Sequence, residues 1–121
     1  MSIPAYNTVA WFQIGTGAPG EARRFYGDMF GWRFADDTAD EGYELITYAG
    51  AQAPSGGLAS QGGDHAEFFV LVADVDAACA EAQRLGGKVA VPPKSAASGL
   101  RFAHLQDPAG NRFGVFTEPS A

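Results

Sequence analysis

The same order of predicted elements occurs twice along this chain of 121 residues, and this repeat restricts the fold more than any other feature. Each half begins with a strand rich in β-branched and aromatic residues, over residues 8–14 and 67–72. A helix and three further strands follow in each half. We therefore predict an α+β fold with two βαβββ modules, module one over about residues 5–60 and module two over about 65–119, in a single domain of residues 1–121.

The two predicted helices have clear ends. Pro19 suits the first turn of the first helix and Gly31 its end, whereas Asp74 is a good N-cap for the second helix and Gly86 follows it. Apolar residues recur at helical spacing, which predicts one apolar stripe on each helix. The first stripe is Ala22, Phe25, Tyr26, Met29 and Phe30, and the second is Val75, Ala78, Cys79, Ala82 and Leu85.

Turn-forming residues separate the shorter strands. The segment KVAVPP (88–93) is predicted as a strand that its two prolines end. Residues 35–42 are predicted as a polar hairpin loop, and residues 55–60 as a short, weak fourth strand. The segment DPAGN (107–111) matches a type I turn, which predicts a hairpin close to the C-terminus.

Composition excludes several classes of partner. The net charge is −6 and the pI is near 4.6, so nucleic acid and membrane surfaces are not expected to bind, because both require clustered basic residues. The longest apolar run, residues 68–73, suits a buried strand and is too short to span a membrane. The first residues lack the pattern of a secretory signal, and the single Cys79 fits a reducing compartment. A cytoplasmic protein is expected.

Four segments, in the same order and at similar intervals, resemble the vicinal oxygen chelate superfamily, which includes glyoxalase I, extradiol dioxygenases and bleomycin-resistance proteins. They are FYGDMFGW, DVDAACAEAQRLGGKV, VPP and DPAGNRFGVF. The resemblance implies two βαβββ modules whose curled mixed sheets surround a concave cavity, with the helices on the convex side. It also implies a homodimer.

Metal-using members of this superfamily take His or Glu ligands from four strands. By resemblance, these ligand positions correspond here to Trp11, a place near Gly57, Glu67 and Gly114. Only Glu67 can bind a metal, and one carboxylate does not make a site. We therefore expect no metal and no other cofactor. Zn, Ni, Fe or Mn remains the alternative.

That alternative depends on the register of the fifth strand. If this strand slides by two residues, His65 takes the ligand position on the same face. His65, Glu67 and His104 then form a possible metal site. Otherwise, His104 is interpreted as a hydrogen-bonded histidine without a catalytic role, on a strand face shared with Phe102 and Gln106.

The predicted ligand-binding residues are Trp11, Glu67, Phe69, Gly114 and Phe116, because the ligand positions of the family point inward. We expect the glycine to form part of the cavity floor and to leave room for an aromatic ligand. Two interpretations of the carboxylate remain open. It is either exposed or ion-paired at the start of a strand, or it projects into an aromatic pocket as a candidate general base.

Three functions follow from these residues. The first is a metal-free protein that binds or sequesters an aromatic or amphipathic small molecule, as bleomycin-resistance proteins do. The second is a lyase, isomerase or dioxygenase that uses Glu67 as a base or an unforeseen metal site. The third is a structural module whose own side chains fill the cavity. Fold alone does not choose among them.

Overall fold

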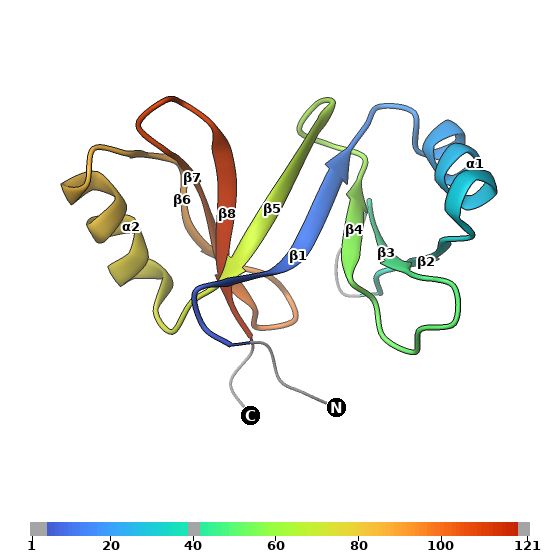
Figure 1. The fold of residues 1–121 in the computed structure, drawn as a ribbon, viewed down its shortest axis with the longest axis horizontal. Coiled ribbons are helices and arrows are strands. Elements are labelled where there is room, and N and C mark those ends of the chain that lie inside the picture. Colours follow the sequence, from blue (N-terminus) through green and yellow to red (C-terminus); the bar gives the residue numbers. More distant parts are fainter. Residues whose placement is uncertain (1–4, 39–41, 119–121) are drawn as a thin grey trace. The chain divides into compact units, whose positions relative to one another are not determined.

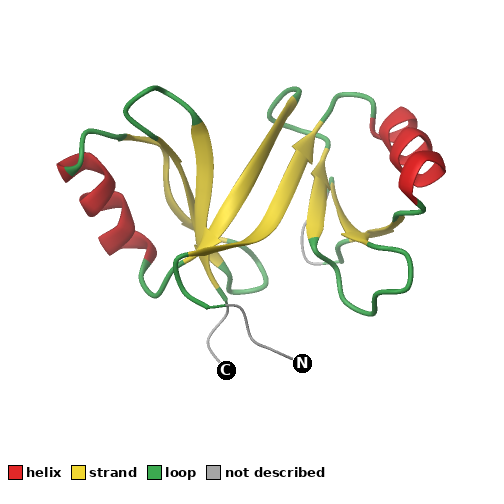
Figure 2. Ribbon diagram, in the orientation of Figure 1, coloured by secondary structure: helices red, strands yellow, loops and turns green. Residues whose placement is uncertain are grey.

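The computed structural model describes residues 5–38 and 42–118 and confirms the α+β fold with two βαβββ modules (Figures 1 and 2). Module one contains, in order, β1 (Thr8–Gly15), α1 (Pro19–Phe30), β2 (Arg33–Asp36), β3 (Tyr43–Thr47) and β4 (Gly56–Ala59). Module two contains β5 (His65–Leu71), α2 (Val75–Arg84), β6 (Lys88–Ser95), β7 (Arg101–Gln106) and β8 (Arg112–Thr117).

Two compact units nearly coincide with the two modules. One unit is Trp11–Ala66, and the other combines Met1–Ala10 with Glu67–Ala121. The strand order is β2-β3-β4-β1 in module one and β5-β8-β7-β6 in module two. In each module the first strand pairs in parallel with the last, and the other pairs are antiparallel. The strand pairing within each module is therefore mixed, as predicted.

Module two has a continuous hydrophobic core between α2 and its sheet. The helix lies against β6, β7 and β8 (Figure 1). Its Asp74 cap accepts a hydrogen bond from the Ala77 backbone N–H at 3.0 Å, as its sequence position predicted. Burial raises the pKa of the Cys79 thiol, which suits a packing residue rather than a reactive one. The buried core residues are Val72, Val75, Cys79, Ala103, Leu105 and Val115.

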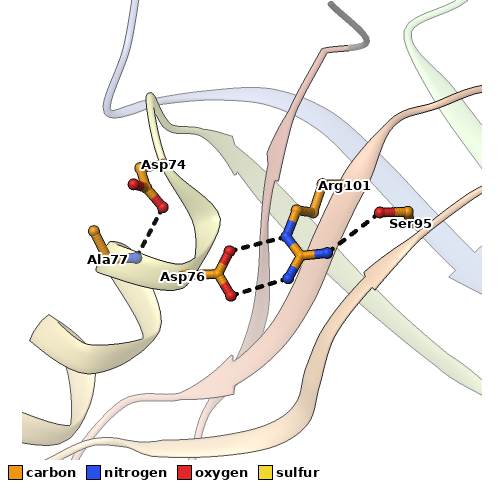
Figure 3. A network of polar contacts seen from close by, with 5 residues as sticks. All are labelled: Asp74, Asp76, Ala77, Ser95 and Arg101. Carbon is orange, nitrogen blue, oxygen red and sulfur yellow. Dashed lines mark hydrogen bonds and ion pairs between the residues drawn. The ribbon is translucent and has the colours of Figure 1, made fainter.

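An ion pair also ties α2 to its sheet (Figure 3). The Arg101 guanidinium donates two hydrogen bonds to the Asp76 carboxylate, each 2.9 Å long, and a third to the Ser95 hydroxyl at 3.2 Å. These hydrogen bonds hold the pKa of Asp76 below its ordinary value. Helix and strand are thereby linked at a point outside the apolar core.

Helix α1 ends as predicted, with Gly31 in the left-handed conformation at φ 74°. Its expected apolar stripe, however, is not buried, since Phe25 and Met29 are 61% and 64% exposed. The helix contacts β2, an edge strand of its sheet, and an ion pair links it to β3. Its Tyr26 ring also stacks on Trp32 with ring centroids 5.3 Å apart.

Two details of the loops and edges complete the fold. Strand β6 continues through Pro92 and Pro93, contrary to the prediction that they end it, because an edge strand tolerates the missing N–H groups. The predicted turn is confirmed by the hydrogen bond from the Gly110 N–H to the Asp107 carbonyl at 2.9 Å. The expected loop over residues 35–42 lies partly outside the described residues, and β2 already includes its first two positions.

Neither helix in the described part of the chain has the length and apolar character needed to cross a membrane.

Candidate functional site

Strand register in module two places the candidate residues on the sheet face opposite α2. Val70, Val72 and Leu105 pack toward the helix as part of the core. Because side chains alternate along a strand, the neighbouring positions point to the other, helix-free face. Strand pairing aligns Phe69 with Gly114 and Gly114 with His104. The helix-free face therefore carries Glu67, Phe69, Phe102, His104, Arg112, Gly114 and Phe116.

The polar centre of this face is a buried pair formed by Glu67 and His104. The His104 Nδ1 atom lies 3.0 Å from Glu67 Oε2. The Glu67 side chain is 1% exposed, and the His104 side chain is 10% exposed. An ionised carboxylate only accepts hydrogen bonds, so Nδ1 carries the hydrogen. Glu67 is therefore buried, which excludes the exposed interpretation, but it is also ion-paired, as the first interpretation allowed, and aromatic rings lie beside the pair.

Arg112 adds a positive charge beside this pair. Its Nε atom lies 3.7 Å from Glu67 Oε2, which is an ion-pair distance rather than a hydrogen bond. The Arg112 side chain is nearly half exposed, so water screens part of its charge. The carboxylate is thus held between an imidazole and a guanidinium, which offsets part of the free-energy cost of burying it.

The ring of Phe69 covers Gly114. A Cβ atom at position 114 would overlap this ring, so the space expected above the glycine is already filled by a side chain of the protein. The Phe69 ring meets the His104 ring edge to face, with centroids 5.4 Å apart, and the Phe116 ring at 6.3 Å. Gly114 is therefore needed for packing between neighbouring strands, and the expectation that it leaves room for a ligand is wrong.

Module one has an aromatic counterpart to the ring that covers Gly114 in module two. The Trp11 indole N–H donates a hydrogen bond to the Tyr43 hydroxyl at 3.0 Å. The Tyr43 ring occupies the space that a side chain at Gly57 would need. Phe12, on the opposite face of β1, packs against Trp32 instead. Trp11 therefore lies on the helix-free face, as its register predicted.

His65 is held by its own hydrogen bonds. Its Nδ1 atom lies 2.9 Å from the Gly63 carbonyl oxygen, and its Nε2 atom lies 3.1 Å from the side-chain nitrogen of Gln13. The carbonyl requires a hydrogen on Nδ1, so Nε2 accepts from the amide. Since both ring nitrogens take part in these bonds, a metal would have to displace Gln13.

The residues present do not fit a divalent metal. At the four positions that resemble the family's ligands, Trp11, Gly57 and Gly114 supply no side-chain oxygen or imidazole nitrogen, which leaves Glu67 alone. Across residues 5–38 and 42–118, no three His, Cys, Asp or Glu side chains gather into a metal-binding group. In addition, the Tyr43 ring covers Gly57 and the Phe69 ring covers Gly114.

Sequence reasoning assigned Tyr43 only to a strand and missed its hydrogen bond to Trp11. It interpreted His104 as a hydrogen-bonded histidine, which is confirmed, but grouped it with Glu67 only in the alternative metal site. A usable signal was present for the histidine, because it lies three residues before DPAGN in the hairpin that also carries Gly114. Hairpin pairing places those two positions side by side.

A family profile identifies the superfamily. The profile described as Glyoxalase/Bleomycin resistance protein/Dioxygenase superfamily matches residues 8–115. The chain therefore belongs to this superfamily, as its motifs indicated. A search of curated protein sequences found no match.

Solved structures with the same fold are mostly enzymes. A methylmalonyl-CoA epimerase variant from Streptomyces coelicolor, in complex with 2-nitronate-propionyl-CoA, is 17% identical with a TM-score of 0.64, over 97% of this chain and 98% of that chain. An extradiol ring-cleaving dioxygenase from B. fuscum is 19% identical with a TM-score of 0.68, over 97% and 34%. A Mn(II)-bound glyoxalase from Novosphingobium aromaticivorans is 14% identical with a TM-score of 0.63, over 93% and 38%. At these identities, the similarity establishes the fold alone.

Proposed function

We propose that this protein binds a small, largely aromatic molecule without a metal ion, on the helix-free face of module two. The observation that carries the proposal is the buried Glu67–His104 pair among aromatic rings, at positions where relatives that use a metal need several ligands. Apolar surroundings with a few convergent polar groups are typical of small-molecule sites.

The rings around the pair favour a planar ligand. Phe69 and Phe102 meet the His104 ring edge to face at 5.4 and 5.8 Å, and Phe116 lies next to Phe69. Aromatic side chains prefer edge-to-face or offset contacts with other rings. Because the Phe69 ring fills the space over Gly114, a ligand either contacts the outer side of this ring or displaces it.

A binding experiment in the presence of EDTA tests this proposal. Purified protein is screened against a panel of small aromatic molecules by thermal shift, and hits are mapped by amide NMR. A ligand at a hundred times its Kd should stabilise the protein by about 2.7 kcal/mol. The expected shifts lie in β5, β7 and β8. Hits that perturb only α2, or a panel without any hit, would contradict the proposal.

A second candidate is an enzyme that uses Glu67 as a general base, because similar folds serve an epimerase, a glyoxalase and a dioxygenase. The buried carboxylate favours this alternative, since desolvated carboxylates often act in proton transfer. One variant distinguishes the enzyme from the binding protein. Glu67→Gln should abolish turnover in an enzyme, whereas a binding protein should retain affinity for apolar ligands.

We further propose a homodimer. The support is the exposed apolar surface of α1, where Phe25, Met29 and Phe30 are all more than half exposed. A stable dimer would remove such a surface from water. Sedimentation is expected to give twice the 12.7 kDa chain mass, and a single species at that chain mass would contradict the dimer. The cytoplasmic location expected from the sequence stays a prediction.

A further inference from the structure

The imidazole of His104 has one nitrogen engaged and one available. Its Nδ1 atom lies 3.0 Å from the Glu67 carboxylate, and in a neutral imidazole whose Nδ1–H donates to the ionised carboxylate, Nε2 is a lone-pair acceptor. Within the described residues, no hydrogen bond involves this Nε2 atom. Of the two paired side chains, His104 is also the more exposed, at 10% against 1% for Glu67.

The second histidine of the chain provides an internal comparison. His65 also has its Nδ1–H directed to an acceptor, the Gly63 carbonyl, but its Nε2 already accepts from Gln13 at 3.1 Å. Both imidazoles thus carry the hydrogen on Nδ1. They differ at Nε2, which accepts a hydrogen bond from Gln13 in His65. Of the two histidines, only His104 has an Nε2 acceptor available for a ligand.

The surroundings of His104 favour an aromatic partner for that acceptor. Gly114 separates Phe69 from His104 in the strand register, and because it has no side chain the two rings meet across it. The Phe102 ring also meets the imidazole edge to face, with centroids 5.8 Å apart. The charged groups nearby are Glu67 and Arg112, and Oε2 of the carboxylate lies 3.0 Å from His104 Nδ1 and 3.7 Å from Arg112 Nε.

We propose that Nε2 of His104 accepts a hydrogen bond from the ligand, and that Glu67 is the positioning residue that fixes the imidazole tautomer. This inference rests on the proposed binding function and deepens it. The ligand class is a planar apolar ring that carries an O–H or N–H donor, and a phenol is its simplest member. Glu67, previously the candidate general base, then acts through His104 instead of touching the ligand.

A matched pair of probes tests the ligand class. Naphthol and its methyl ether have the same ring system, but only naphthol has a donor. Wild-type protein should bind naphthol about tenfold more tightly, the ratio expected for one hydrogen bond. Equal affinity for the two probes would overturn the inference while leaving the proposed function intact. Binding of neither probe would contradict the proposed function itself.

Two variants separate the role of Nε2 from a structural role. His104→Asn keeps a side-chain N–H for Glu67 but has no acceptor at the Nε2 position, so the preference for naphthol should disappear while the ether still binds. His65→Asn is the control and should keep the preference. A His104→Asn protein that still prefers naphthol tenfold would overturn the inference.

Nitrogen NMR of the two imidazoles tests the positioning role. Wild-type protein should give the Nδ1–H tautomer at both histidines. In Glu67→Gln, an amide no longer favours a hydrogen on Nδ1 as a carboxylate does, so His104 should become a mixture of tautomers and His65 should not change. The preference for naphthol over its methyl ether should decrease as the Nδ1–H fraction of His104 decreases. An unchanged His104 tautomer in Glu67→Gln would overturn the positioning role.

Discussion

The two modules share an order of elements, yet their helices are held differently. Helix α2 buries Val75 and Cys79 against its sheet, whereas α1 buries none of its residues. The stripe of α2 includes alanines and a cysteine, which permit close approach to the strands. The stripe of α1 includes Phe25 and Phe30, which are 61% and 52% exposed. The same apolar spacing therefore does not ensure the same burial.

The helix-free faces differ in a second way. Trp11 and Glu67 occupy equivalent places, because each lies two residues before the position that pairs with a glycine of the last strand, Gly57 or Gly114. In module one that place holds an indole bonded to a phenol, and in module two it holds a carboxylate bonded to an imidazole. The equivalent place is therefore polar in module two and aromatic in module one.

The largest predicted effect concerns the core of module two. Leu105→Ala removes a side chain that is 2% exposed, and it should lower the free energy of unfolding by about 2–5 kcal/mol. The matched control is Leu85→Ala at the C-cap of α2, where the side chain is exposed, and it should change stability by less than about 0.5 kcal/mol. Chemical denaturation measures both. Similar losses at the two leucines would refute the assigned core.

The two covered glycines should respond alike. Gly114→Ala and Gly57→Ala each place a Cβ against an aromatic ring, of Phe69 and Tyr43, and should cost about 1–3 kcal/mol of stability. Gly17→Ala is the control, because a Cβ there meets nothing within 4 Å. If Gly114→Ala is as stable as wild type, the packing of the two strands has been misassigned.

A smaller effect is expected at the indole of module one. Trp11→Phe removes the hydrogen bond to the Tyr43 hydroxyl and should cost about 0.5–1.5 kcal/mol. In the Tyr43→Phe background the same substitution should cost less, because its partner is already lost. A double-mutant cycle by thermal denaturation measures this difference, and complete additivity would argue against the bond.

The smallest effect is the pH dependence of the ion pair between α2 and β7. Arg101 lowers the pKa of Asp76, so the pair stabilises the folded state above the ordinary carboxyl range and loses this contribution as pH falls through the lowered pKa. The stability difference between wild type and Asp76→Asn should be constant near neutrality and shrink below about pH 4. Because both side chains are partly exposed, high salt should reduce this stability difference.

The order of elements could be predicted from the sequence because strand alternation, caps and turn residues are local signals. Asp74, Gly31 and the turn at Asp107 all act within a few residues. The pairing of Glu67 with His104 could not be predicted in the same way, since it depends on the register of β5, β8 and β7. The filled space over Gly114 depends on a side-chain conformation of Phe69, which no sequence pattern specifies.

The central claim is that module two holds a buried Glu67–His104 pair, whereas the residues at the positions that resemble the family's metal ligands do not fit a divalent metal. The most direct test is elemental analysis of protein purified from medium supplemented with Zn, Ni, Fe and Mn, followed by calorimetric titration of each ion into the EDTA-treated protein. We expect far less than one metal per chain and no saturable binding, because the assigned positions supply a single carboxylate. About one tightly held ion per chain, lost in Glu67→Ala, would contradict the claim.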